Sequence, residues 1–499
     1  MNYLLMTNII MAYVIIIKNV FRCTLGFITF LFLFLLVVGC SLPSVTNEHP
    51  PPEKPSTVDY FANNATGNSL ALIQHPAGVH VNNTTYVSYQ GPQSHPYVVA
   101  YDHTNGIWQG PYKAGNSDLA EVFIDKNKIN SHGKPTMLID DLGYIHIFYG
   151  GHGAGNQYGP NPYGGGGLGR NKHAVSMRPY DITEWQDLNN ISVFGTYNQA
   201  IKMDNGDIYL IYRHGAHRSD WTYQKSTDHG RSFSPAVPFL KHKDRKDIDA
   251  FDSWYVWASK GEGNDIIMSF DYHVCWDKGK GPEGLGHITQ RHDLYYMVFD
   301  TQTETLRNIH NSPLAFPVTK EIADDNALVA RTGEDWTFNG SAHLDQHGFA
   351  HIGINIGKNL GQNTGGPKQT AHYHWDGTKW QGGQTVRLQS KIDNTNTRGD
   401  FEIVEQTGHI QYFLAYQDQQ DGVIAKYTSV DNGMSFNKTK ELLRREYASW
   451  AISARIENAH PDAQVIVAEK QATSPWRKVY LIGDNGPIRR DKTGAESQE

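Results

Sequence analysis

The stretch "NGDIYLIYRHGAHRSDWTYQKSTDHGRSF" (205–233) joins a tight turn, a β-rich run and a second turn motif. The Asn–Gly pair favours a hairpin, and "DIYLIY" is typical of a strand. Runs of this kind recur seven times: "TYVSY", "YIHIFY", "DIYLIY", "DIIMSF", "FAHIGI", "HIQYFLAY" and "QVIVA", centred near positions 87, 147, 209, 267, 351, 411 and 466. Long helical patterns are almost absent.

The steps between these centres are 60, 62, 58, 84, 60 and 55 residues. A period of this size with several strands per unit indicates a β-propeller. Six steps separate seven units, so the sequence predicts an all-β, single-domain, seven-bladed β-propeller. The long step predicts an insertion in or after the fourth blade.

Two turn motifs support a repeat. "STDHGRSF" (226–233) and "SVDNGMSF" (429–436) both fit the Asp-box pattern S-x-D-x-G-x-S-F. They begin 17 (226 − 209) and 18 (429 − 411) residues after the centres of their runs. The Asp and Gly suit a tight turn, and the Phe is expected to pack beneath it. The Asp boxes are structural and carry no information about catalysis.

The N-terminal 39 residues predict a bacterial export signal. Lys18 and Arg22 precede the apolar run "CTLGFITFLFLFLLVVGC", and "VVGC" looks like a lipobox. Cys40 would then be the lipidated first residue of the mature protein. The alternative is an uncleaved membrane anchor, because the run is just long enough to span a bilayer. Either way, the rest of the chain is expected outside the cytoplasm, anchored at the cell envelope or secreted.

The remaining chain divides by composition into three parts. Residues 40–65 are proline-rich and predict a semi-rigid tether. Residues 66–488 lack a Pro/Ser-rich break and predict one catalytic propeller domain, since sheet domains of this size can be single units. Residues 489–499 predict a polar tail.

Charge and cysteine content exclude several classes of protein. The net charge is −7, and the signal carries two cations and no acids, so the mature charge is −7 − 2 = −9. A general nucleic-acid binder would show a strongly basic domain. An acidic ligand must therefore meet a local cluster of cations. With Cys23 in the signal and Cys40 lipidated, Cys275 has no thiol partner, which excludes a disulfide framework.

In each of three consecutive units, one polar residue lies about eight to ten residues before the hairpin turn and another lies as far after it. Antiparallel strands bring two such positions to the same rim of the sheet. We expect this rim to be the mouth of the propeller, where the inner strands converge and ligands commonly bind. Each residue could equally serve packing. The three pairs are His132 with His152, Tyr197 with Arg213, and Tyr255 with His273.

This set suits proton abstraction beside a carboxylate. Neither paired carboxylates nor a Ser-His-Asp order stands out in the sequence. In a uronic acid, a cation on the carboxylate stabilises the enolate-like transition state formed when the C5 proton leaves. A nearby guanidinium lowers the pKa of a tyrosine, which makes the phenol a workable base. The other member of the Tyr and His pair can protonate the leaving oxygen at C4. The predicted reaction is therefore β-elimination.

The lone cysteine stands among histidines. His217, His273, Cys275 and His287 offer three imidazoles and a thiolate, a complete tetrahedral zinc set with no open position, so the zinc would be structural. It would brace the fourth-blade insertion against the loop after Arg213. The alternative is a buried inert cysteine with unrelated histidines. Competing ligands are His214, His242 and His292.

Several long segments resemble the ulvan lyases of polysaccharide lyase family 25. They are "NSHGKP", "YGGHGAGNQYG", "FGTYNQ", "YRHGAHRSDWTYQKSTDHGRSF", "DSWYVWA" and "DYHVCWDKG...GH". The resemblance covers essentially the whole mature chain. It implies a seven-bladed propeller, an extracellular role and a His/Tyr elimination mechanism. The implied substrate is ulvan, a sulfated polysaccharide in which 3-sulfated rhamnose is linked to glucuronic or iduronic acid.

The resemblance also implies roles for individual residues. His132 and Tyr197 would handle the protons, and Arg213 would neutralise the uronate carboxylate. His152 and Tyr255 would line the substrate site. The structural zinc would be held by His217, His273, Cys275 and His287. The expected partner is the anionic polysaccharide and no nucleic acid, with membrane contact only through the lipid, and a monomer is expected.

Two other functions stay open at this point. A sialidase-type glycoside hydrolase shares the propeller and the Asp boxes, but it needs an arginine triad and a tyrosine nucleophile backed by a carboxylate. The early "FRIP"-like segment of such chains is missing. A non-catalytic carbohydrate-binding propeller would need aromatic platforms and no Tyr/His/Arg cluster. The sequence also leaves open which of His132 and Tyr197 is the base.

Overall fold

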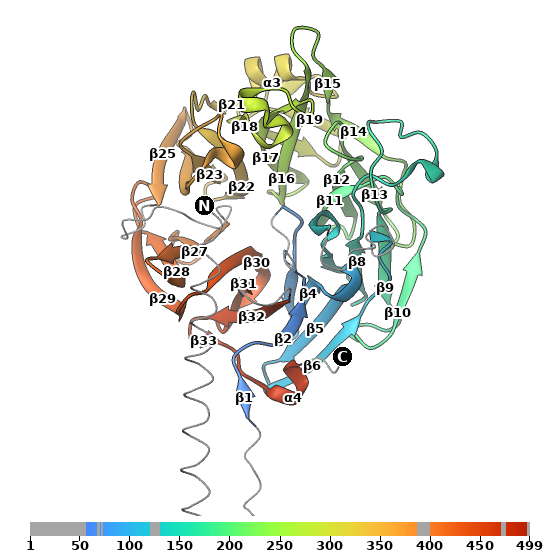
Figure 1. Ribbon diagram of the computed structural model, residues 1–499, viewed down its shortest axis with the longest axis vertical. Helices are drawn as coiled ribbons and strands as arrows, with labels where there is room; N and C mark the ends of the chain where they lie inside the picture. Colours follow the sequence, from blue (N-terminus) through green and yellow to red (C-terminus); the bar gives the residue numbers. More distant parts are fainter. Residues whose placement is uncertain are drawn as a thin grey trace, which may run out of the picture. The chain divides into compact units, whose positions relative to one another are not determined.

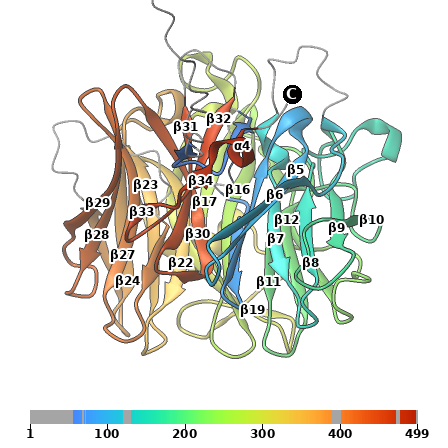
Figure 2. The ribbon, with the colours of Figure 1, turned by 90° about the horizontal axis from the view of Figure 1, so that it is seen from below.

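The computed structural model describes residues 56–66, 70, 73–119, 130–386, 400–470 and 476–496. Residues 55–499 form one compact unit. Its β-sheets are arranged around a common centre (Figure 1), and the strands run side by side when seen at a right angle (Figure 2). The predicted all-β, propeller-like fold is confirmed. The predicted signal and Cys40 lie outside the described residues.

Four sheets contain four antiparallel strands each. The first two are β7 (Thr136–Ile139), β8 (Ile145–Tyr149), β9 (Lys172–Ser176) and β10 (Trp185–Leu188), then β11 (Thr196–Lys202), β12 (Ile208–Arg213), β13 (Trp221–Ser226) and β14 (Val237–Leu240). The others are β22 (Trp336–Leu344), β23 (Ala350–Gly357), β24 (Lys368–Trp375) and β25 (Trp380–Val386), then β26 (Phe401–Ile403), β27 (Ile410–Asp418), β28 (Asp421–Ser429) and β29 (Asn437–Arg445).

Two sheets are larger. The seven-stranded sheet contains β15 (Lys243–Asp244), β16 (Ala250–Lys260), β17 (Asp265–Trp276), β18 (Arg291–Asp300), β19 (Thr305–Arg307), β20 (Pro313–Leu314) and β21 (Leu328–Ala330). The nine-stranded sheet contains β2 (Ala62–Ala65), β3 (Gly78–Val81), β4 (Thr84–Gln90), β5 (Pro96–Asp102), β6 (Ile107–Lys113), β30 (Ser449–His460), β31 (Ala463–Lys470), β32 (Arg477–Gly483) and β33 (Gly486–Pro487).

The helices of the described residues are short. The α-helices are α3 (Lys320–Asn326) and α4 (Lys492–Ala495). The 3-10 helices are η1 (Pro92–Ser94), η2 (Ser131–Gly133), η3 (Asn156–Tyr158), η4 (Pro282–Gly284), η5 (Gly286–Ile288) and η6 (Asn363–Gly365). No helix in these described segments is long and apolar enough to cross a bilayer.

The nine-stranded sheet joins the two ends of the unit. β3 pairs with β30 in parallel at Val79 and Glu457, whereas the other strand pairs of this sheet are antiparallel. All seven β-rich runs of the sequence lie in strands, as predicted. The expectation of seven separate blades is wrong as a count of sheets, because the described residues form four four-stranded sheets, one sheet of seven strands, one of nine strands and one of two. A sequence period locates strands, but it does not say which neighbouring units share hydrogen bonds.

The predicted ends of the propeller need correction. The proposed tether was expected to reach residue 65 and the tail to begin at residue 489. Instead β1 (Thr57–Val58) pairs with β34 (Arg490–Asp491), and β2 pairs with β32. The backbone N–H of Lys492 also donates to the carbonyl of Ser56 at 2.9 Å. These short strands are held by backbone hydrogen bonds, and their polar sequences carry no hydrophobic pattern that would reveal them.

The insertion is found where the long step predicted it. Between β18 and β22 the chain adds β19, β20, α3 and β21 to the seven-stranded sheet. Helix α3 begins after Thr319, whose side chain accepts a hydrogen bond from the N–H of Ile322, as N-cap residues do.

The main core cluster includes Trp221, Trp254 and Tyr255, and Tyr197 packs against it. The residues of the predicted mouth therefore rest on a packed core.

Both Asp boxes form the expected turn. The Asp228 carboxylate accepts hydrogen bonds from the hydroxyl of Ser226 at 2.8 Å and from the N–H of Ser232 at 2.9 Å. In the second copy, Asp431 accepts from the hydroxyl of Ser429 at 2.7 Å and from the N–H of Ser435 at 2.9 Å. The same hydrogen bonds at the same positions confirm that the two motifs are structural repeats.

Candidate active site

Four of the six residues expected at the mouth, His132, His152, Tyr197 and Tyr255, line one open pocket of about 830 Å³, whereas Arg213 and His273 are buried and do not line it. They come from the loops and strand ends of three neighbouring sheets. Its lining includes His132, His152, Tyr197, His217, Tyr255, Cys275, His287 and Arg291, together with the glycines Gly165 and Gly166. Polar residues from three consecutive units therefore meet at one pocket, and four of the six predicted residues are among them.

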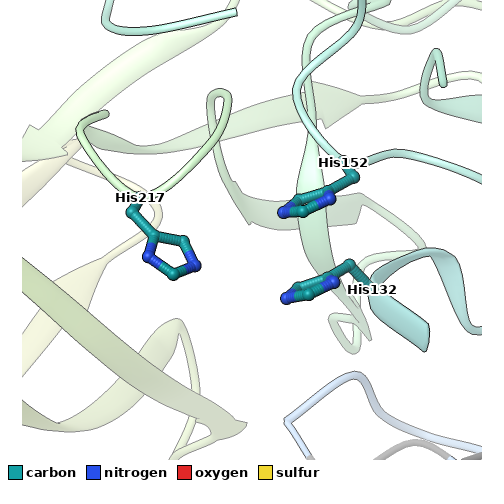
Figure 3. A group of neighbouring side chains, drawn as sticks. All are labelled: His132, His152 and His217. Carbon is teal, nitrogen blue, oxygen red and sulfur yellow. The ribbon is translucent and has the colours of Figure 1, made fainter. Parts of the chain in front are cut away.

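His132 and His152 form a stacked pair. His132 lies in η2, just before β7, and His152 follows β8. Backbone hydrogen bonds of 2.9 and 2.8 Å between His152 and Leu168 hold the second ring in place. The ring centroids are 3.7 Å apart and the planes are parallel within 3° (Figure 3). The Nδ1 atom of each ring lies 2.8 Å from the side-chain amide of Asn130.

Tyr197 lies near the start of β11 in an unusual backbone conformation. Its φ is 65°, in the left-handed region, and the pairing with β12 shifts register between Thr196 and Gln199. Such bulges re-aim a side chain, and strained residues of this kind cluster at functional sites. The Tyr197 ring lies 5.7 Å from the rings of both His132 and Tyr255.

Arg213 ends β12, opposite Thr196, and its side chain is fully buried. Its guanidinium carbon lies 4.8 Å from the ring centre of Tyr197 and 5.6 Å from that of Tyr255. Its Nη1 and Nη2 atoms are buried without a hydrogen-bond partner among the described residues. A buried cation whose donors are unpaired is costly. The buried Arg213 guanidinium is therefore complementary to an anion, and it lies 4.8 Å from the ring centre of Tyr197, whose ring lies 5.7 Å from that of His132.

A second guanidinium, which the sequence reasoning missed, faces the same pocket. Arg291 begins β18 opposite His273, and its Nη2 donates to the hydroxyl of Tyr255 at 3.0 Å. Its guanidinium carbon lies 4.2 Å from the ring centre of Tyr255. Arg291 follows His287 by four residues in a segment already rich in candidate ligands, which is the signal that could have identified it. Two cations favour a ligand with more than one anionic group.

The stacked histidines are neutral at neutral pH. Burial is the main cause that lowers the pKa of His132, to about 2, and the neighbouring His152 and Arg213 lower it further. Burial also lowers the pKa of His152 to about 4, with Arg213 adding to the effect. Both imidazoles are therefore uncharged before a ligand binds, and each has one nitrogen with a proton and one without.

The four candidate zinc ligands lie beside this pocket. His273 and Cys275 come from β17, His287 from η5 and His217 from the loop after β12. The rings of His217 and His287 are 4.4 Å apart, and those of His217 and His273 are 6.3 Å apart. Burial raises the pKa of the Cys275 thiol, and the adjacent Arg218 opposes this shift.

The donor types fit zinc, but the four ligand atoms do not converge on one point. Nδ1 of His273 is buried without a hydrogen-bond partner among the described residues, which suits a ligand. Its Nε2, however, faces the carbonyl of His287 at 2.7 Å. Within the described segments, the one group of potential ligands whose donor atoms all lie within 4.8 Å is His132, His152 and His217 (Figure 3).

Comparisons with known proteins agree with the fold. A family model described as BNR repeat-containing family member matches residues 84–387. The chain is 53% identical to an ulvan lyase of Alteromonas sp. (strain LOR) over 91% of this chain and 93% of that protein. It is 54% identical to the ulvan lyase PL25 of Pseudoalteromonas sp. (strain PLSV), over 91% of this chain and 92% of that one.

Solved structures give the same result. A polysaccharide lyase PL25 ulvan lyase bound to -[GlcA(1-4)Rha3S]- superposes with a TM-score of 0.83 at 55% identity, covering 88% of this chain and 98% of that chain. The polysaccharide lyase Uly1, at 14% identity and a TM-score of 0.54, shares the fold alone. Fold, pocket and relatives define the chain as a polysaccharide lyase. It belongs to the ulvan lyases of polysaccharide lyase family 25.

We expect folding stability to fall as the pH drops below about 6.5, the pKa of histidine in an unfolded chain. His132 and His152 have lowered pKa values in the fold, so in this window the unfolded chain takes up protons that the folded chain refuses. The loss begins near pH 6.5 and continues down to about 4 for His152. The midpoint temperature of unfolding, measured at pH 7.5, 6 and 5 at constant ionic strength, should fall.

A variant isolates these two groups from other buried histidines. His132→Gln combined with His152→Gln should show a shallower decline, by up to about 1.4 kcal/mol per pH unit for each histidine removed. Equal slopes in the variant and the parent protein would contradict the assignment of neutral rings.

Proposed function

We propose that this protein cleaves ulvan by β-elimination at the bond between 3-sulfated rhamnose and a uronate. The products would carry an unsaturated uronate at the non-reducing end. The observation that carries the proposal is the buried guanidinium of Arg213, whose terminal nitrogens lack a partner among the described residues and which lies 4.8 Å from the ring of Tyr197. An anionic sugar would supply the missing partner.

The reaction requires three tasks: neutralisation of the carboxylate, removal of the C5 proton and protonation of the leaving oxygen. Arg213 binds the uronate carboxylate and stabilises the negative charge that develops when the C5 proton leaves. Tyr197 and His132, with rings 5.7 Å apart, act as the proton-handling pair. As the C5–H bond breaks, its electron pair forms the C4–C5 double bond, and the C4–O bond breaks. The leaving oxygen then receives a proton, so no water is consumed.

His152 and Tyr255 line the same substrate site, as the family resemblance implies. Tyr255 is held by the hydrogen bond from Arg291 at 3.0 Å, which fixes its hydroxyl. Arg291 supplies a second cation beside the pocket, and we assign it to a further anionic group of the polymer. Because both arginines are buried at 0% and 9% exposure, their charges are poorly screened by water.

The lining of the pocket argues against a hydrolase. Among its described lining residues, none is Asp or Glu. A glycoside hydrolase of the ordinary kind needs two carboxylates, and a sialidase needs a carboxylate behind its tyrosine. A purely binding propeller could use the guanidinium to hold an anionic sugar, but it would not need a proton-exchanging phenol and imidazole beside it. The elimination mechanism uses all three groups.

Incubation with ulvan should raise the ultraviolet absorbance, because each cleavage creates a conjugated C4–C5 double bond. Tyr197→Phe should lower this activity by at least about 100-fold, the usual contribution of a positioned acid or base. The fold should survive, since the ring still packs against the core. The rate of absorbance increase and circular dichroism are the two measurements.

The matched control is Tyr447→Phe, the same change on a ring that is 72% exposed. It should keep full activity. New reducing ends without absorbance would identify a hydrolase, and binding without either product would identify a lectin. Substantial activity of Tyr197→Phe would remove this residue from the mechanism.

We also propose that His217, His273, Cys275 and His287 hold a structural zinc ion. Support comes from the donor types, from the unpartnered Nδ1 of His273 and from the buried free thiol. A zinc ion would draw the thiol and imidazoles together and lower the pKa of Cys275. Held by four protein ligands, it would brace β17 and η5 against the loop after β12 and supply no chemistry to the substrate.

The purified protein should contain about one zinc per chain by elemental analysis, as expected for a closed four-ligand site. Cys275→Ser should lose most of this metal, and a chelator should lower the unfolding temperature of the parent protein before it lowers activity. Tyr197→Phe is the control and should keep its zinc. An unchanged unfolding temperature in zinc-free protein would refute a structural metal.

The cellular location is a further proposal. We infer that the N-terminal segment exports the chain, that Cys40 carries the lipid, and that the mature propeller acts as a monomer outside the cytoplasm. Support comes from the apolar run and the "VVGC" motif alone. After expression in a bacterium that processes lipoproteins, the N-terminal peptide should begin at an acylated Cys40, and Cys40→Ser should abolish acylation. An unmodified N-terminal peptide from the parent protein would overturn this inference.

A further inference from the structure

We propose that Asn130 is a positioning residue that fixes the two stacked histidines in opposite tautomers. His132 then carries an unprotonated Nε2 that can accept a proton, and His152 carries an Nε2–H that can donate one. The tautomers follow from hydrogen bonds alone, whereas their use in catalysis rests on the proposed function. The pair thereby becomes an ordered acid–base couple rather than two equivalent rings.

The orientation of the Asn130 amide is settled by a backbone group. The N–H of His132 donates to Oδ1 of Asn130 at 3.0 Å. A backbone N–H can only donate, so the amide atom that faces it must be the oxygen and not the nitrogen. The amide cannot be flipped without placing two donors against each other.

The same oxygen determines the state of His132. Nδ1 of His132 lies 2.8 Å from Oδ1 of Asn130. An amide oxygen only accepts, so Nδ1 must carry a hydrogen. In a neutral imidazole the other nitrogen is then an acceptor. Nε2 of His132 is therefore the basic nitrogen of this ring.

The other end of the amide determines the state of His152. Nδ1 of His152 lies 2.8 Å from Nδ2 of Asn130. An amide NH₂ only donates, so Nδ1 of His152 must be the acceptor, and the ring hydrogen lies on Nε2. The two Nε2 atoms thus have opposite character, although the rings stack at 3.7 Å.

Both rings must be neutral for this assignment, and the surroundings require it. Two imidazolium cations stacked 3.7 Å apart would repel each other strongly in a buried site. The uncompensated charge of Arg213 adds to the repulsion, since it contributes to the lowered pKa of both histidines. An anionic ligand beside Arg213 would offset this repulsion and make protonation of either ring more favourable.

Asn130 is itself held firmly. Its side chain is 7% exposed, and its carbonyl accepts a hydrogen bond from Nε2 of Gln90 at 3.2 Å. Nε2 of Gln74 donates to the carbonyl of His132 at 2.7 Å, which fixes η2 from the other side. The backbone of Asn130 and His132 is thus anchored, and the side-chain amide of Asn130 is held by the N–H of His132.

The assignment has consequences for both histidines. His132 can accept one of the two protons of the reaction through Nε2. Tyr197 then handles the second proton. His152 does more than line the pocket, because its Nε2–H can donate a hydrogen bond to an anionic group of the substrate. In the close grouping of His132, His152 and His217, the Nδ1 atoms of the stacked pair are engaged by Asn130, so only their Nε2 atoms face the pocket, and in the assigned tautomers only Nε2 of His132 has a free lone pair.

The test is direct observation of the ring nitrogens. The full-length protein, labelled with ¹⁵N in histidine, would be studied by long-range ¹H–¹⁵N correlation, and the two rings would be assigned by the signals lost in His132→Gln and His152→Gln. We expect a protonated Nδ1 for His132 and a protonated Nε2 for His152. Two rings in the same tautomer would overturn the proposal.

Asn130→Asp tests the cause. A carboxylate places an acceptor where the NH₂ was, so His152 should change to the Nδ1–H tautomer while His132 keeps its own. We expect kcat on ulvan to fall about tenfold or more, since positioned proton transfer contributes about 10²–10⁴-fold, while KM changes less than about threefold. Asn437→Asp, the same change on an exposed strand residue, should alter neither the spectrum nor kcat.

The outcomes separate this proposal from the proposed function. The tautomers are read without substrate, so a protein inactive on ulvan with the expected tautomers would refute the function and keep the assignment. An active protein in which Asn130→Asp leaves both kcat and the His152 tautomer unchanged would refute the role of Asn130. If this variant fails to fold, the spectrum of the parent protein still decides the tautomers.

Discussion

The buried cation of Arg213 is the constraint on which the rest of the site depends. A guanidinium at 0% exposure, with its terminal nitrogens unpaired among the described residues, is unfavourable by itself. The faces of Tyr197 and Tyr255, at 4.8 and 5.6 Å, offset part of this cost. The remainder must be met by the stability of the sheets, and an anionic ligand bound at the guanidinium would recover it.

The same charge determines the character of its neighbours. It disfavours protonation of His132 and His152, so the stacked rings stay neutral, and it leaves the pocket without need of an acidic side chain. Electrostatic preorganisation of this kind stabilises charge where it develops in the reaction. A carboxylate in the pocket would pair with the arginines and remove this advantage, which explains why the lining is cationic in a protein of negative net charge.

Paired strands connect the candidate metal ligands to the substrate site. Across β16 and β17, His273 is paired with Ser253 and Asp271 with Tyr255, and on the other side of β17, His273 is paired with Arg291. His273 is therefore a direct strand partner of Arg291, which lines the pocket, and it lies two residues from the strand partner of Tyr255. This arrangement explains how a metal that touches no substrate could still hold the geometry of Tyr255 and Arg291.

Local patterns along the chain were sufficient to locate the strands, the two Asp boxes and part of the pocket lining, because alternation and hairpin symmetry place His132, Tyr197 and Tyr255 at the same rim. The sheet count, the strand pair β1–β34, the second cation Arg291 and the amide of Asn130 required the folded molecule. Backbone pairing between distant segments and the partner of a single amide oxygen leave no period in a sequence. They are decided only when the two ends of the chain meet and the side chains are packed.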